Sequence, residues 1–176
     1  MRILKGKLAG RSLVSPSRNV RPTAESVRDR GLEAMGADLT KARFLDLFAG
    51  AGGVGLEAIS RGARSADFVE NGGPALHSLK ANVAAMRIGK KARVFKKDVV
   101  PWIERLGPDS YDIAWVDPPY GSRKLDRVIQ KWKRDAFARI LILEHHREHD
   151  LPITGEHIDF EGPTRITLVR AEPSPE

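Results

Sequence analysis

An acidic and aromatic element, Asp117-Pro118-Pro119-Tyr120, directly follows the apolar run 111–116. The Asp117 carboxylate can accept one N–H of an aromatic amine, and the Pro118 carbonyl can accept the other. The two prolines fix φ and stiffen the loop, and Tyr120 offers a ring on which a base can stack. Accepting both N–H groups stabilises the positive charge that develops on the nitrogen as it is alkylated. Residues 117–120 are therefore the predicted catalytic residues for alkylation of an exocyclic amine.

A glycine loop lies between the apolar run 43–48 and a helical pattern. Gly50, Gly52 and Gly55 satisfy G-x-G-x-x-G, and Glu70 follows Gly50 by twenty residues. Such glycines allow a tight strand-to-helix turn and a close approach of a cofactor to the backbone. An acid at the end of the neighbouring strand can accept hydrogen bonds from both ribose hydroxyls. The pattern predicts a cofactor that contains a ribose, and a glycine turn without a ligand is the plain structural alternative.

The cofactor type depends on Asp46, which precedes the glycine loop. A carboxylate there would repel a dinucleotide's pyrophosphate, which prefers bare N–H groups at a helix N-terminus. It would instead attract a sulfonium cofactor that carries a free ammonium group. S-adenosyl-L-methionine (AdoMet) is therefore the predicted cofactor, and a dinucleotide oxidoreductase is a distant alternative. Asp98 follows the third apolar run. Its carboxylate can accept a hydrogen bond from the adenine amino group of the cofactor, or it can cap the next helix.

Short apolar runs alternate with helical patterns from residue 43 onward. The runs suit buried parallel strands and lie at 43–48, 66–69, 92–95, 111–116 and 140–143. The predicted helices lie at 54–60, 74–86, 100–106 and 124–133. In the last helix Leu125, Val128, Ile129 and Trp132 share one face, so that face packs on the sheet. The alternation predicts a doubly wound α/β domain, in which ligands bind beyond the carboxyl ends of the strands.

The two ends of the chain differ from this pattern. Residues 157–160 and 165–169 flank a turn sequence, which predicts a hairpin appended to the sheet. At the other end we expect a small hairpin within residues 1–14, a loop over 15–20, and a helix from residue 22 or 23 to about residue 35.

Composition limits the function classes. The chain has 176 residues, 41% hydrophobic and 30% charged, which suits one globular domain. It has no cysteine, which excludes disulfides and thiolate chemistry and fits the cytoplasm. We expect no membrane span and no secretory signal. The group Glu144, His145, His146, Glu148 and His149 is interpreted as a solvated strand end, and no metal is predicted.

The net charge of +7 points to a polyanionic partner. Residues 1–30 alone carry eight basic and two acidic side chains, and further basic clusters lie at 87–97 and 123–139. The predicted RNA phosphate contacts are Arg11, Arg18, Arg21 and Arg28. The alternative is that these four are solvated charges or internal ion-pair partners.

Three segments together resemble the RsmD family of 16S ribosomal RNA guanine-N2 methyltransferases. They are the glycine loop with residues 55–63, the Asp-Pro-Pro-Tyr-Gly element at 117–121, and Arg-Pro-Thr-Ala-Glu-Ser-Val-Arg at 21–28. The likeness runs from residue 1 to about residue 145. It implies that AdoMet is lined by Asp46, Phe48, Gly50, Gly52, Glu70 and Asp98, and that residues 117–120 hold guanine. Gly31 and Asn71-Gly72-Gly73 depart from the family's usual residues.

The resemblance implies an α/β fold of the class I AdoMet-dependent methyltransferase (Rossmann-like) type, with a C-terminal antiparallel hairpin. A basic N-terminal arm over 1–40 would face RNA, and 41–176 would form the methyltransferase domain. The expected function is methylation of guanine N2 in ribosomal RNA by a monomer, with the RNA free or within the small subunit or its assembly intermediate. A DNA adenine-N6 methyltransferase and a non-catalytic RNA-binding or assembly factor are the alternatives.

Overall fold

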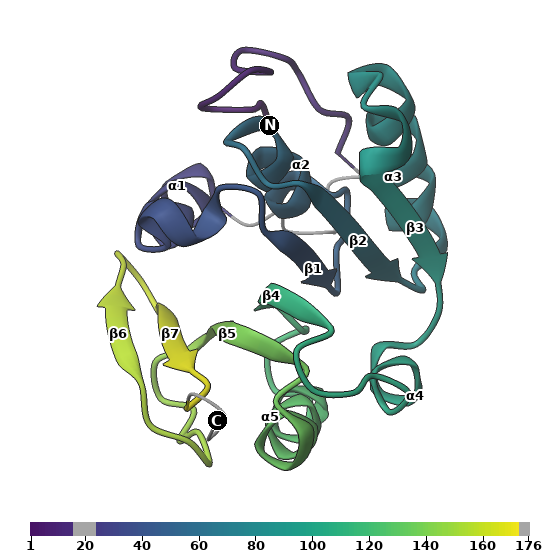
Figure 1. The fold of residues 1–176 in the computed structure, drawn as a ribbon. Helices are drawn as coiled ribbons and strands as arrows, with labels where there is room; N and C mark the ends of the chain where they lie inside the picture. The colour runs from purple at the N-terminus through teal and green to yellow at the C-terminus, as the bar shows by residue number, and fades with distance from the viewer. Residues whose placement is uncertain (16–23, 173–176) are drawn as a thin grey trace.

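The computed structural model describes residues 1–15 and 24–172, and within them it forms one seven-stranded sheet with helices on both faces (Figure 1). The strands are β1 (Arg43–Leu47), β2 (Ser65–Glu70), β3 (Ala92–Lys96), β4 (Tyr111–Val116), β5 (Ala138–His146), β6 (Glu156–Asp159) and β7 (Thr164–Arg170). Their order across the sheet is β3-β2-β1-β4-β5-β7-β6. The first five strands are parallel, and β7 runs antiparallel to both β5 and β6. The predicted doubly wound sheet and its appended hairpin are confirmed.

The helices divide between two hydrophobic clusters, one on each face of the sheet. They are α1 (Glu25–Glu33), α2 (Gly53–Ser60), α3 (Gly73–Met86), α4 (Val99–Ile103) and α5 (Lys124–Asp135), with 3-10 turns η1 (Gly36–Leu39) and η2 (Gly89–Lys91). The first three helices share one cluster with Phe44 and Trp115, and α4 and α5 share the other with Leu45 and Val116. The predicted helices of the methyltransferase domain are confirmed, although α4 ends three residues earlier than expected. Trp132 is buried, as its spacing indicates.

The strand end at β5 differs from its prediction. The apolar run predicts a strand over 140–143, whereas β5 continues to His146 because β7 pairs with it along this length. Glu144 and His145 are both buried there. The interpretation of this group as a solvated strand end is therefore wrong for these two side chains.

The N-terminal segment packs onto the sheet domain rather than extending away from it. A single bridge joins Arg2 and Ser12, and the buried Ile3 and Leu13 belong to the same cluster as the α2 side chains. A Cβ on Gly6 would lie 1.9 Å from the Ser60 carbonyl oxygen, so this turn contacts the end of α2 closely. The predicted loop at 15–20 and the predicted helix start lie largely outside the described residues, and α1 is described from Glu25.

None of the helices in the two described stretches combines the length and the apolar character needed to cross a membrane.

Candidate functional site

A cavity of about 580 Å³ lies at the carboxyl ends of the central strands. Its walls include Asp46, Phe48, Gly50, Glu70 and residues 117–120, so the structure brings most of the predicted cofactor and catalytic residues together. Gly52 and Asp98 are not among its lining residues. The glycine loop and the Asp-Pro-Pro-Tyr element therefore face one crevice, as expected because ligands bind beyond the carboxyl ends of the strands in open α/β sheets.

The glycine loop uses its glycines in two different ways. Gly50 has φ +56°, lines the cavity, and has open space around the position of a Cβ. Gly52 has φ +83°, and a Cβ there would lie 2.5 Å from Cδ1 of Leu79 on α3. Gly50 therefore leaves room on the cavity side, while Gly52 lets the loop pack against α3. Phe48 also adopts a positive φ of 63°, which is uncommon for a large side chain.

Asp46 is almost completely buried beneath the loop, with 2% of its surface exposed. Its Oδ2 accepts a hydrogen bond from the backbone N–H of Gly55 at 2.9 Å. Burial raises the pKa of Asp46 well above its usual range, and the nearby Asp117 and Glu70 carboxylates raise it further. A cation in the cavity would favour the ionised form of this acid.

Glu70 is fixed by three backbone donors at the end of β2. Its Oε2 accepts from the N–H of Gly50 at 2.8 Å, and its Oε1 accepts from Asn71 at 2.8 Å and from Gly72 at 2.6 Å. A Cβ on Gly72 would lie 3.1 Å from Oε1. The turn at Asn71-Gly72 therefore fits closely around the carboxylate.

Asp98 is the N-cap of α4, because its Oδ1 accepts from the N–H of Val100 at 3.2 Å. Its Oδ2 lies 3.3 Å from Nζ of Lys124, a cavity residue. The capping alternative for Asp98 is thus present in the structure, and its contact with adenine stays a prediction. Sequence reasoning did not single out Lys124, because it reaches the site from α5.

The Asp-Pro-Pro-Tyr loop is held by the C-terminal hairpin. The hydroxyl of Tyr120 forms a 2.9 Å hydrogen bond with Oγ1 of Thr164 on β7. The Tyr120 ring meets His146 edge-on, with 5.9 Å between ring centroids. Tyr120 is 44% exposed, so its ring is accessible to a base. Sequence reasoning did not identify Thr164 or His146, because both reach the loop through the β5–β7 pairing.

Arg28 lies inside the fold, with none of its surface exposed. Its Nη2 donates to the carbonyl of Arg2 at 2.6 Å, and its Nε lies 3.4 Å from Oε2 of the buried Glu57. Its Nη1 lies beside the cavity residue Gly53 and has no hydrogen-bond partner among the described residues. The predicted phosphate contact does not fit this burial, and the alternative of an internal ion pair is what the structure contains.

The other predicted RNA contacts lie elsewhere. Arg11 is exposed, and its Nη1 reaches the carbonyls of Ala85 and Met86 at the end of α3, both at 3.4 Å. Arg18 and Arg21 lie outside the described residues.

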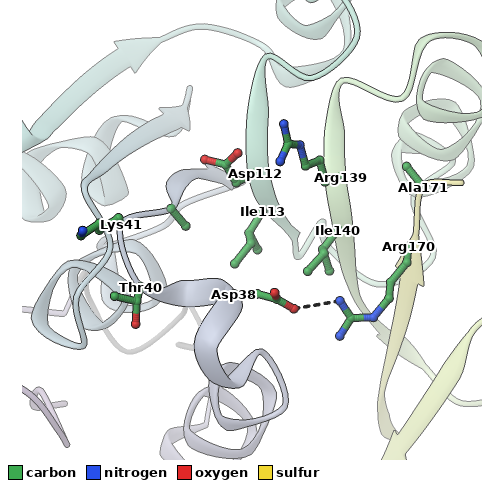
Figure 2. Close-up of a pocket in the computed structure, with 10 residues that line it drawn as sticks. Asp38, Thr40, Lys41, Asp112, Ile113, Arg139, Ile140, Arg170 and Ala171 are labelled. Carbon is green, nitrogen blue, oxygen red and sulfur yellow. Dashed lines mark hydrogen bonds and ion pairs between the residues drawn. The ribbon is translucent and has the colours of Figure 1, made fainter. Parts of the chain in front are cut away.

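A second cavity, of about 470 Å³, lies at the opposite edge of the sheet, where β4 and β5 begin (Figure 2). Arg170 pairs with Asp38 across it at 2.9 Å. Arg139 pairs with Asp109 at 3.3 Å. None of the predicted site residues within 1–15 and 24–172 lines it.

The fold and the arrangement of the first cavity define a class I AdoMet-dependent methyltransferase. The family model described as "Conserved hypothetical protein 95" matches residues 1–159, and the chain belongs to this family. The predicted resemblance to the RsmD family is confirmed by curated relatives named "Ribosomal RNA small subunit methyltransferase D".

Two relatives illustrate the extent of the match. "Putative rRNA methyltransferase YlbH" of Bacillus subtilis is 32% identical over 163 residues, which cover 88% of this chain and 87% of the relative. "Ribosomal RNA small subunit methyltransferase D" of Escherichia coli is 31% identical over 156 residues, which cover 86% of this chain and 78% of the relative.

Solved structures agree on the fold. A putative methyltransferase, yhhF from Escherichia coli, superposes with a TM-score of 0.85 at 28% identity and covers 99% of each chain. An RNA methyltransferase from Salinibacter ruber, solved with S-adenosyl-L-homocysteine, has a TM-score of 0.66 at 16% identity, covering 89% of this chain and 97% of that one.

Proposed function

We propose that this protein transfers the methyl group of AdoMet to the exocyclic N2 amine of a guanine in small-subunit ribosomal RNA. The observation that carries the proposal is one cavity lined by Asp46, Gly50 and Glu70 on one side and by Asp117 and Tyr120 on the other. The names of the curated relatives support ribosomal RNA as the substrate. The presence of Asp46, Glu70 and residues 117–120 in one cavity speaks against a non-catalytic assembly factor.

The residues present fit AdoMet group by group. The buried Asp46 suits the cationic ammonium and sulfonium side of the cofactor. Glu70 suits the ribose hydroxyls, and the open space at Gly50 leaves room beside the backbone. Nη1 of Arg28 is a buried donor without a partner among the described residues, and a carboxylate is the acceptor that it suits best. When bound, AdoMet supplies an electrophilic methyl group.

The chain's own residues would then act on the amine. The Asp117 carboxylate and the Pro118 carbonyl accept the two N–H bonds of guanine N2, which orients its lone pair toward the cofactor side of the cavity. The Tyr120 ring stacks on the base, and its hydrogen bond to Thr164 holds it in place. Once the nitrogen is alkylated it becomes acidic, and Asp117 is positioned to hold the proton that it loses.

RNA must present an unstacked guanine to this cavity, because a paired or stacked base cannot reach Asp117. We propose that basic side chains hold the flanking backbone, namely the exposed Arg11, the cluster at 87–97, and Arg18 and Arg21, which lie outside the described residues. We further propose that the protein acts as a monomer in the cytoplasm, on RNA that is free or within the small subunit or its assembly intermediate.

The test is transfer of tritium from labelled AdoMet to 16S ribosomal RNA, to assembling small subunits and to DNA, followed by nucleoside analysis. We expect N2-methylguanosine from an RNA substrate. Asp117→Ala should lower turnover by about 10²–10³ and leave AdoMet affinity nearly unchanged, since it removes one group that acts in the transition state. Label found in N6-methyladenine of DNA, or in no nucleic acid, would refute the proposal.

A further inference from the structure

Glu144 lies next to the predicted amine-binding residue on the neighbouring strand. In the parallel pairing of β4 with β5, Val116 is opposite Leu143, so the next residues along, Asp117 and Glu144, end up side by side. On its other side Glu144 is opposite Ile166 of β7. Glu144 and Asp117 both line the cavity.

The alternation of side chains along the strands places both acids on one face of the sheet. Trp115 and Ile142 belong to the cluster on the α1–α3 face, whereas Val116 and Leu143 belong to the cluster on the α4–α5 face. Asp117 and Glu144 follow Val116 and Leu143, so the period of two returns them to the α1–α3 face. The base-binding side of the cavity thus has two carboxylates at the ends of adjacent strands. Neighbouring strands in a sheet lie about 4.8 Å apart.

Glu144 is held within the cavity wall rather than in solvent, because only 6% of its surface is exposed. Removing a carboxylate from water is costly, and a salt bridge or hydrogen bonds to its oxygens offset that cost. An ionised carboxylate can only accept hydrogen bonds. Because its two oxygens together offer about four acceptor sites, Glu144 can accept a hydrogen bond from a base that enters this cavity, beside any other contact that it makes.

Guanine presents two neighbouring donors on its Watson–Crick edge, N1–H and the N2 amine. Adenine and 2-aminopurine present an unprotonated N1, which is an acceptor. We propose that Glu144 accepts the N1–H of guanine while Asp117 accepts from its N2 amine, so that Glu144 selects guanine over purines whose N1 is an acceptor. This inference rests on the proposed function and adds to it the residue that recognises the base.

The test uses short RNAs of the target sequence, once the labelled-AdoMet assay has located it, with either guanine or 2-aminopurine at the target position. Both bases carry the N2 amine, and 2-aminopurine lacks N1–H. Wild-type protein should prefer guanine in kcat/KM by at least about 10²-fold, because a site built to accept a hydrogen bond rejects an analogue that cannot donate it.

Glu144→Gln should reverse part of this preference. Its amide can donate to the bare N1 of 2-aminopurine, so kcat/KM for 2-aminopurine should stay constant or rise. The amide oxygen can still accept the N1–H of guanine but has lost its charge, so kcat/KM for guanine should fall by about tenfold. Glu148→Gln is the matched control, because it removes an exposed carboxylate four residues further on and should leave the preference unchanged. AdoMet affinity, measured by calorimetry, should be the same in all three proteins.

Two results would overturn the role of Glu144 while leaving the proposed function intact. One is an equal kcat/KM of wild-type protein for the guanine and the 2-aminopurine RNA. The other is a folded Glu144→Gln protein whose kcat/KM falls by the same factor for both RNAs. A wild-type protein that methylates no guanine would instead refute the proposed function. If Glu144→Gln does not fold, Glu144→Asp takes its place, and it should weaken guanine use without any gain for 2-aminopurine.

Discussion

The indole ring of Trp115 occupies the space that a side chain on Gly31 would need. A Cβ on Gly31 would lie 2.5 Å from Cη2 of Trp115 and 2.7 Å from Cδ1 of Ile166. Gly31 is in α1, and Trp115 is in β4, two residues before the predicted catalytic Asp117. The absence of a side chain at Gly31 thus lets α1 approach β4 and β7, and β4 leads directly to Asp117.

We expect Gly31→Ala to lower the free energy of unfolding by roughly 1–2 kcal/mol. Overpacking against the Trp115 ring outweighs the gain of about 1 kcal/mol that alanine brings to a helix. Urea denaturation measures the difference. Gly73→Ala is the control, because Gly73 is also helical but a Cβ there meets nothing within 4 Å, so its stability should stay constant or rise. A Gly31→Ala protein as stable as wild type would show that the helix moves away freely.

The sequence predicted the features of this site that depend on neighbours along the chain. The alternation of apolar runs located the five parallel strands, and the order of Asp46, the glycine loop and Glu70 located the cavity. Arg28 was misplaced because its partner Glu57 comes from α2, and nothing near residue 28 in the sequence indicates this pairing. Glu144 was misplaced because β7 buries the end of β5, and this burial depends on the pairing of Glu144 with Ile166, 22 residues further along the chain.

Gly50 and Gly52 should respond differently to the same substitution. Gly50→Ala adds a methyl group beside the cavity, and apart from its chain neighbours no atom of residues 1–15 and 24–172 lies within 4 Å of that position, so AdoMet affinity should fall by at least about tenfold. Its positive φ should cost about 1–2 kcal/mol of stability. Gly52→Ala combines a positive φ with the Leu79 clash, so its loss of stability should be larger. Calorimetric titration measures AdoMet affinity, and urea denaturation measures stability. Equal stabilities of Gly50→Ala and Gly52→Ala would contradict the packing role assigned to Gly52.

AdoMet binding should release a proton from Asp46. Burial raises the pKa of this carboxyl in the free protein, and the cationic cofactor favours its ionised form, so binding lowers that pKa. Affinity should therefore increase with pH up to the pKa of the free protein and then level off. Calorimetry in buffers of different ionisation enthalpy measures the released proton. The release should be smaller for S-adenosyl-L-homocysteine, whose sulfur is neutral, and absent in Asp46→Asn.

The Asp46 carboxyl should also make the stability of the free protein depend on pH, with stability falling where AdoMet affinity rises. Its pKa is higher in the folded than in the unfolded protein, so the folded state holds the proton to higher pH. The free energy of unfolding should therefore fall as pH rises from the unfolded pKa to the folded one. Asp46→Asn should remove this fall, and a variant with the wild-type pH profile would assign the effect to another group.

Arg28→Lys should weaken AdoMet binding by roughly 10- to 100-fold, the scale of one hydrogen bond to a charged group. Lysine keeps the positive charge near Glu57 but has no second branch to aim at the cavity. Decarboxylated AdoMet is the matched ligand, because it lacks the group that Nη1 of Arg28 would bind. Wild-type protein should favour AdoMet over it, and Arg28→Lys should bind the two nearly equally. An unchanged preference in the variant would place the carboxylate elsewhere.

The exposed lysines beside β3 should carry part of the RNA affinity. Lys90, Lys91, Lys96 and Lys97 are exposed, and within residues 1–15 and 24–172 none of them forms an ion pair. If all four contact phosphates, changing them to glutamine should flatten the slope of log affinity against log salt by about 2.8, using about 0.7 per contact for single strands. Filter binding at several salt concentrations measures the slope.

The control is Arg139→Gln combined with Arg170→Gln at the opposite edge of the sheet (Figure 2). Both arginines already pair with aspartates, so this loss of charge should leave the slope nearly unchanged. Deleting the N-terminal arm would be a poorer test, because Ile3 and Leu13 belong to the core and Met1 lines the cavity. If the lysine variant keeps the wild-type slope, the phosphate contacts belong to Arg11 and the neighbouring basic residues of that arm.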